Sequence, residues 1–168
     1  ILKCGNKPDL RFLVISSDVI YPDGAMRDYE SRFFLPFKGF EKPIYAIPGN
    51  HDWYDALESF CAVFMEKEAA RRAIRARVEE DQNLSTTTDG RIDAMLEQAE
   101  RLEDLYNLDV GHQRAPYFQL QTEKFALIAV DTGILRRVDP DQRRWLTSAL
   151  REAEGKFVML LLGHPFYA

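Results

Sequence analysis

The segment of this chain most suggestive of chemistry is Gly49-Asn50-His51-Asp52, in which an amide, an imidazole and a carboxylate follow one another directly. An Asn side-chain oxygen can bind a metal ion without adding charge, and a His oriented by a neighbouring Asp can donate a proton to a leaving group. Gly49 lets the backbone turn sharply enough to aim both neighbours at one point. The tetrapeptide therefore predicts a site that combines a metal ligand with a general acid.

Three other residues of these chemical kinds occupy similar positions in the sequence. Asp18, Asp131 and His164 each follow a short apolar run within three residues, as Asn50 does, and the four runs are residues 12–15, 44–47, 125–130 and 157–162. Runs that are apolar on both faces predict strands buried in a layered α/β fold. Ligands in such folds collect outside the carboxyl ends of the strands, so we expect these side chains to meet at one edge.

Residues 55–113 have a different pattern and are interpreted as a helical hairpin inserted into the α/β frame. The first helix is expected to begin at Asp55, because Asp55 and Glu58 have the spacing of a capping box, and to carry an interrupted apolar stripe as far as Val78. The second helix carries apolar residues at helical spacing, namely Ile92, Met95, Leu96, Ala99, Leu102 and Leu105. Because the insertion follows the Gly-Asn-His-Asp segment, our hypothesis is that it caps the site and restricts substrate size.

A third helix is predicted over residues 141–153, after Pro140, with Trp145, Leu146 and Leu150 facing the core. His112 is expected in a surface loop rather than in a site. A group of arginines in the first inserted helix is interpreted as a solvated face rather than a phosphate clamp, because acidic residues nearby can balance it. The group comprises Arg71, Arg72, Arg75 and Arg77, and the acidic residues are Glu66, Glu68, Glu79 and Glu80.

The composition excludes several classes of protein. The 168 residues carry 27 acidic and 22 basic side chains, a net charge of −5 with no long Lys/Arg run, which argues against a dedicated nucleic-acid surface. The two cysteines, Cys4 and Cys61, have neither disulfide-scaffold nor zinc-finger spacing. The apolar runs are much shorter than the roughly 20 residues that cross a bilayer. We therefore expect a soluble domain without a transmembrane segment, with the cytoplasm as the favoured compartment.

Three blocks of the sequence resemble the calcineurin-like metallophosphoesterases. Gly49-Asn50-His51-Asp52 matches the Gly-Asn-His-Asp/Glu motif of that superfamily, and Ser17-Asp18 is similar to its Gly-Asp block, with Ser17 in place of the glycine. Gly163-His164 resembles the later single-histidine block, and Asp131-Thr132-Gly133 resembles, with Gln142 and Trp145, the stretch that commonly precedes it. The resemblance implies a partial four-layer α/β/β/α sandwich, because the 109 residues outside the insertion are too few for the complete fold.

The same resemblance implies a binuclear metal centre of manganese, iron or zinc ions. Asp18 would bridge the two ions, and Asn50 and His164 would bind one of them. Tyr21 lies where the purple acid phosphatase branch has an iron-binding tyrosine.

The reaction that the resemblance implies is hydrolysis of a phosphomonoester or phosphodiester, with a small phosphoester as the partner. Two metal ions would activate a bridging water for in-line attack and neutralise the charge that develops. His51 would protonate the leaving group, and Asp52 would orient His51.

A second interpretation is a phosphoesterase-like fold that has lost catalysis and serves as an interaction module. Members of the superfamily also carry an Asp-x-His block before these motifs and a Gly-His-x-His block after them, and this chain has neither. We interpret the chain as a piece truncated at both ends, so that finding both blocks in the parent protein would favour the enzyme. Two other hydrolase classes fail on residue grounds. A haloacid-dehalogenase-type site at Asp131 lacks its second carboxylate, and a serine hydrolase lacks the Gly-x-Ser-x-Gly elbow.

Overall fold

The strands of this protein form two small sheets. The computed structural model describes residues 7–80, 87–133 and 137–164. In the first sheet β1 (Leu13–Ile15) pairs in parallel with β2 (Ile44–Ala46). The second sheet has the order β3-β4-β5, in which the first pair is antiparallel and the second parallel, and its strands are β3 (Phe118–Gln121), β4 (Phe125–Val130) and β5 (Phe157–Leu162). The four predicted apolar runs all form strands, which confirms the general α/β class.

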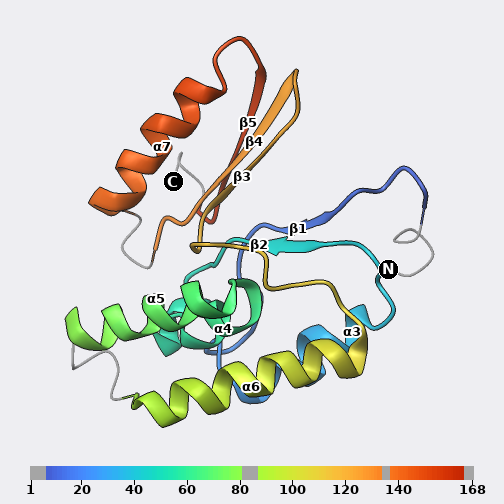
Figure 1. Ribbon diagram of the computed structural model, residues 1–168, viewed down its shortest axis with the longest axis vertical. Helices are drawn as coiled ribbons and strands as arrows, with labels where there is room; N and C mark the ends of the chain where they lie inside the picture. The colour runs from blue at the N-terminus through green and yellow to red at the C-terminus, as the bar shows by residue number, and fades with distance from the viewer. Residues whose placement is uncertain (1–6, 81–86, 134–136, 165–168) are drawn as a thin grey trace.

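Figure 1 shows α7 (Pro140–Glu152) beside the second sheet and the other helices below the first sheet. Between β1 and β2 lie α2 (Met26–Tyr29), the π-helical turn η1 (Glu30–Phe34) and α3 (Leu35–Phe37). Between β2 and β3 lie η2 (Asp52–Asp55), α4 (Glu58–Phe64), α5 (Lys67–Glu80) and α6 (Asp89–Tyr106). The last helix, α7, connects β4 to β5. In the described ranges we find no helix with both the length and the apolar character needed to cross a membrane.

Strand β4 lies between two hydrophobic clusters because successive side chains of a strand point to opposite faces. Its residues Ala126, Ile128 and Val130 pack with α7, where Ala149 is buried. Leu127 and Ala129 face the other way and share a cluster with Ile47 and Phe118, against which side chains of β1 and β2 also pack. The second sheet therefore has α7 on one face and residues of the first sheet on the other.

The largest cluster of buried residues covers the opposite face of the first sheet. It joins Ile44 and Ala46 of β2 to aromatic residues such as Phe33 and Phe64 and to buried residues of α4, α5 and α6. The helices of the insertion therefore contribute to the main core, in addition to any role as a cap. Each large aromatic side chain buried there stabilises the fold by roughly 3–5 kcal/mol.

The predicted first helix of the insertion is wrong in its start and its continuity. Helix α4 begins at Glu58, because Ala56 and Leu57 take the left-handed conformation with φ of 58° and 60°, which interrupts the helix. Asp55 still serves the helix start, since its Oδ2 accepts the Ser59 N–H at 3.2 Å. Met65 is extended and separates α4 from α5.

Several strand and helix residues expected in the core are exposed instead. Leu105 of α6 is 63% exposed and Leu150 of α7 is 48% exposed, because each lies on the outer side of the buried stripe of its helix.

Strand β5 was expected to be buried on both faces, yet Phe157 is 67% exposed. This strand lies at the edge of its sheet, with β4 on one side. Small residues, Ala149 and Ala153, fill the interface that α7 makes with β4.

Two arginines of α5 pair with acidic residues of α6. Arg71 pairs with Asp93, and Arg75 Nε lies 2.8 Å from Asp89 Oδ1. Surface pairs of this kind each contribute about 0–1 kcal/mol, so they align the helices more than they stabilise them. Of the predicted acidic partners, Glu66 pairs with Arg114, and the side chains of Glu79 and Glu80 lie outside the described ones. Arg72 and Arg75 are exposed, as a solvated face predicts, but Arg77 is half-buried, donates to the Ala73 carbonyl and lies over the Trp53 ring. Charge balance by the four glutamates stays a prediction.

Candidate functional site

The loops that follow β1, β2 and β5 are in direct contact. Ser17 Oγ donates to the carbonyl oxygen of Gly163 at 3.1 Å, and a Cβ added to Gly163 would lie 2.8 Å from the carbonyl oxygen of Pro48. The backbone N–H of His51 donates to Asp18 Oδ1 at 3.2 Å. The three segments predicted to carry site residues therefore meet at one edge of the fold, as the strand-end argument expects.

Asp18 takes the left-handed conformation, with φ of 41°. A non-glycine residue in this region costs roughly 1–3 kcal/mol, and such strain clusters at functional sites. The carboxylate is held on both sides, because Oδ1 accepts from His51 N–H and Oδ2 accepts from the Tyr21 hydroxyl at 2.8 Å. This hydrogen bond raises the pKa of Tyr21. The phenol of Tyr21 is therefore a protonated donor to Asp18 in this structure.

Gly49 is required by the contact between the first two loops. A Cβ at this position would lie 2.0 Å from Asp18 Oδ1 and 2.4 Å from the Asp18 backbone nitrogen. Any side chain larger than hydrogen would push these loops apart. The glycine thus brings the backbone of the Asn50 segment against the carboxylate of Asp18.

Asp52 is fully buried and binds the backbone of both loops. Its Oδ2 accepts the N–H groups of Val19 at 3.0 Å and Gly49 at 2.9 Å, and its Oδ1 accepts the N–H of Ile20 at 3.1 Å. Burial raises the pKa of this carboxyl, while the three hydrogen bonds act to lower it. The expectation that Asp52 orients the imidazole of His51 is wrong, because both of its oxygens serve these backbone groups.

The partner of His51 is instead the backbone carbonyl of Pro22, which lies 2.6 Å from Nδ1. A carbonyl oxygen accepts but cannot donate, so Nδ1 carries the hydrogen and Nε2 is left for chemistry. The ring also lies between Tyr21, at 4.1 Å between centroids, and Tyr54, at 5.1 Å. These contacts, rather than Asp52, therefore orient the imidazole of His51.

Asn50 and His164 each have one side-chain atom engaged and another left for a ligand. Asn50 Nδ2 donates to the Tyr54 hydroxyl at 3.2 Å, and we find no hydrogen bond from described residues to its Oδ1. His164 Nδ1 lies 2.9 Å from Thr132 Oγ1, which leaves Nε2. Metal-binding histidines commonly have their second nitrogen held in this way.

The residues in place fit metal binding in kind but not in number. Asp18, Asn50 and His164 offer a carboxylate, an amide oxygen and an imidazole, which suit manganese, iron or zinc. In residues 7–80, 87–133 and 137–164, however, there is no group of three or more His, Cys, Asp or Glu side chains placed to hold an ion. Metal binding by Asp18, Asn50 and His164 therefore stays a prediction.

Comparisons with known proteins name no relative. No family model matches the chain, and neither a curated protein nor a solved structure gives a significant match. The interpretation of the site therefore depends on its own geometry.

Sequence reasoning missed the group of residues beneath this edge. Trp53 Nε1 donates to Asp131 Oδ1 at 3.2 Å, and the Arg77 guanidinium lies 5.5 Å from the centroid of the Trp53 ring. Burial raises the pKa of Asp131 to about 6. The sequence signals were the direct succession of Asp52 and Trp53 and the position of Asp131 at the end of an apolar run.

Two buried glutamines hold the ends of the central strands. Gln142 Oε1 accepts the N–H of Asp131 at 2.9 Å, and its Nε2 donates to the carbonyl of the same residue at 2.8 Å. Gln113 makes the same pair of bonds to Ala46, at 2.8 and 2.9 Å. Each amide side chain thus takes the place of a neighbouring strand. No periodicity in the sequence marks Gln113 for this role.

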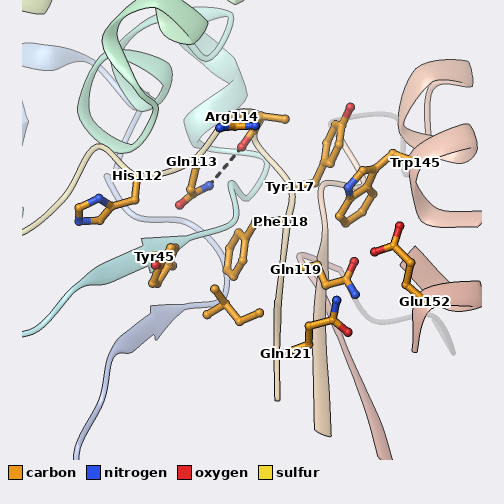
Figure 2. Close-up of a pocket in the computed structure, with 12 residues that line it drawn as sticks. Tyr45, His112, Gln113, Arg114, Tyr117, Phe118, Gln119, Gln121, Trp145 and Glu152 are labelled. Carbon is orange, nitrogen blue, oxygen red and sulfur yellow. Dashed lines mark hydrogen bonds between the residues drawn. The ribbon is translucent and has the colours of Figure 1, made fainter. Parts of the chain in front are cut away.

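One pocket lies away from the candidate site residues. Its volume is about 670 Å³, and Figure 2 shows it between Tyr45 of β2, Phe118 of β3 and Trp145 of α7. His112, which lines this pocket, is exposed in a loop and bonds through Nε2 to Asp109 Oδ1 at 2.6 Å. The surface position of His112 is confirmed. None of the candidate site residues is among those that line this pocket.

Proposed function

We propose that this protein hydrolyses phosphoesters at the edge where the loops after β1, β2 and β5 meet. The observation that carries the proposal is the contact between the Asp18 carboxylate and the backbone of Gly49 and His51. It brings the loop that carries Asp18 against the loop that carries Asn50 and His51, from two separate strand ends. The bond between Ser17 and Gly163 adds the segment that carries His164.

Asp18, Asn50 and His164 are the residues that would hold a metal ion in this site. When bound, such an ion supplies Lewis-acid activation of water and stabilises charge on the phosphoryl oxygens. The second ion of the proposed binuclear centre would need donors beyond these three residues.

His51 is the proposed general acid. Pro22 holds the hydrogen on Nδ1, so the protonated imidazole can release a proton only from Nε2. A positioned acid of this kind contributes typically 10²–10⁴-fold to the rate. Asp52 is a positioning residue in this proposal, because it fixes the loop on which His51 lies rather than its ring.

The packing of the two sheets supports the finer proposal of a four-layer α/β/β/α sandwich. Residues of β1 and β2 pack toward β4 on one side and toward the helices α4 and α6 on the other. Helix α7 then covers the far side of β4. Two sheets face to face with helices outside are the arrangement that the sequence resemblance implies.

The test uses metal analysis and hydrolysis of p-nitrophenyl phosphate by the full-length protein. We expect Asn50→Ala to lose metal and activity together. His51→Ala should keep its metal and lose about 10²–10⁴-fold in rate. The matched control is His112→Ala, which removes an exposed imidazole that the site does not use, and it should change neither quantity. Full metal content and full activity in Asn50→Ala would contradict the proposal.

A second candidate, an interaction module without catalysis, is favoured by one observation. The described residues do not gather three His, Cys, Asp or Glu ligands at the site. A protein of this kind would bind no metal and would hydrolyse no phosphoester with any added divalent ion. The same metal analysis therefore separates the two candidates.

A further inference from the structure

A second cavity, of about 380 Å³, lies next to the proposed site and has no role in the chemistry above. Its volume is within the range of small-molecule pockets, roughly 300–1,000 Å³. Trp53, Arg77 and Tyr117 line it, together with small residues that include Ala73 and Ala76 of α5. The alanines leave space between aromatic walls, which is the composition expected where a flat ring binds.

Trp53 connects this cavity to the proposed site. Its backbone N–H donates to the carbonyl oxygen of Asn50 at 3.3 Å, and its indole Nε1 donates to Asp131. A Cβ added to Gly133 would lie 3.7 Å from Cζ2 of the indole, so the ring also contacts the residue that directly follows Thr132, the partner of His164. A substrate that reaches from the site into the cavity would therefore pass along Trp53.

The charged groups around the cavity already have partners. Arg77 lies over the Trp53 ring, where Asp131 also acts on it, and its guanidinium donates to the Ala73 carbonyl at 3.0 Å. Arg114 Nε lies 3.3 Å from Glu66 Oε1, and Asp141 pairs with Arg144. Asp139 caps α7 by accepting from the N–H of Gln142 at 2.9 Å. Because these charges are balanced locally, the cavity does not call for a charged ligand.

We infer that this cavity binds an uncharged, flat aromatic ring, namely the leaving group of the phosphoester that the neighbouring site hydrolyses. The inference rests on the proposed function for its substrate. The ring would extend the existing stack of Arg77 on Trp53, an arrangement in which cation–π and aromatic contacts add to the burial of apolar surface. An aryl ester and a nucleoside ester both present such a ring.

The experiment observes the indole N–H signal of Trp53 in a ¹⁵N-correlated NMR spectrum of the full-length protein, assigned as the signal that Trp53→Phe lacks. The ligands carry no phosphate: phenol and adenosine as the two sources of a ring, and cyclohexanol as the non-aromatic match. We expect phenol or adenosine to move the Trp53 signal to saturation, and cyclohexanol to leave it in place. The tighter of the two ligands identifies the source of the ring.

Two matched substitutions test the location. Ala76 is an exposed residue of α5 that lines the cavity, and Ala94 is an exposed residue of α6 away from it. Ala76→Phe should fill the cavity and weaken ring binding at least about tenfold, which corresponds to 1.4 kcal/mol. Ala94→Phe should leave the affinity unchanged. Thermal unfolding of both variants checks that they are folded.

The outcomes separate this inference from the proposed function. An equal response to cyclohexanol, or undiminished ring binding in folded Ala76→Phe, would overturn the assignment of the cavity. Metal-dependent hydrolysis without any ring binding contradicts the cavity and leaves the proposed function standing. Ring binding without metal-dependent hydrolysis contradicts the proposed function, and with it the identification of the ring as a leaving group.

Discussion

Gly49 and Asp18 approach each other so closely that a Cβ on Gly49 would lie 2.0 Å from Asp18 Oδ1. The second nearest atom, at 2.4 Å, is the backbone nitrogen of Asp18, which cannot rotate away. We therefore expect Gly49→Ala to destabilise the fold by about 3 kcal/mol, the upper range for overpacking, and to abolish metal binding. Urea unfolding and metal analysis measure the two effects.

The matched control for this substitution is Gly90→Ala. Gly90 lies in the first turn of α6, and a Cβ there would meet nothing within 4 Å. Since Ala favours the helix over Gly, this variant should gain up to about 1 kcal/mol. If Gly49→Ala were as stable as the native protein, the two loops would not be packed as described.

The strand ends were predictable from the sequence, because apolar runs that precede polar residues are a local pattern. The loops that carry Asp18, Asn50 and His164 accordingly meet at one edge. The partners of these residues were not predictable. The imidazole of His51 bonds to the carbonyl of Pro22, and backbone groups carry no signature of their own in the sequence.

The core of the insertion was predictable in pattern but not in placement. Buried Ile92, Leu96, Ala99 and Leu102 follow the expected stripe of α6. However, the buried stripe of α6 ends at Leu102, so that the next predicted residue is exposed. The start of α4 depends on the backbone conformation at Leu57. Both depend on what packs against the helix, which helical periodicity alone does not specify.

Asp52→Asn tests whether Asp52 holds the two loops together through its hydrogen bonds to their backbone. The amide that replaces one oxygen cannot accept, so at least one buried N–H among Gly49, Val19 and Ile20 loses its partner. We expect a loss of about 1–3 kcal/mol for each such group in urea unfolding. Asp104→Asn, at an exposed position of α6, is the control and should change stability by less than about 0.5 kcal/mol.

The same variant distinguishes two roles of Asp52, namely holding the loops together and orienting the imidazole of His51. If Asp52→Asn kept its full stability while hydrolysis fell as far as in His51→Ala, the carboxylate would act on the imidazole after all. Under conditions where Asp52→Asn is folded, the hydrogen bond from His51 Nδ1 to the Pro22 carbonyl should remain. The ¹⁵N chemical shifts of the imidazole measure whether it does.

Asp55 makes the stability of the protein depend on pH. Its Oδ1 is buried without a hydrogen-bond partner among the described residues, and burial raises the pKa of its carboxyl to about 7 from an ordinary value of 3.8. Between these two values the folded protein holds a proton that the unfolded chain has released. The free energy of unfolding therefore falls as the pH rises from about 4 to 7 and levels off above.

Replacing Asp55 by Asn removes the part of this dependence that Asp55 contributes, while the buried carboxyl of Asp131, with its pKa of about 6, keeps its own. We expect Asp55→Asn to be more stable than the native protein at pH 8 by about 2–4 kcal/mol, since one pKa unit corresponds to 1.36 kcal/mol. At pH 4 the two should be nearly equal. Urea unfolding at both values measures the difference, and Asp104→Asn provides the exposed-carboxylate comparison. A stability difference that does not change with pH would show that Asp55 is ionised in the folded protein.

Gln142 is expected to be worth more to the fold than any neighbour on α7. Its amide satisfies both the N–H and the carbonyl of Asp131 in a buried position, so Gln142→Ala leaves two backbone groups without partners. At about 1–3 kcal/mol for each, the variant should lose about 2–6 kcal/mol. Gln98→Ala, the same change on α6 at a partly exposed position, should stay within about 0.5 kcal/mol of the native stability.

Amide hydrogen exchange supplies a local readout, because the Asp131 N–H should exchange faster in Gln142→Ala at equal global stability. Unchanged exchange at Asp131 would mean that another group holds the end of β4, and the loop that carries Thr132 to His164 would then not depend on this helix.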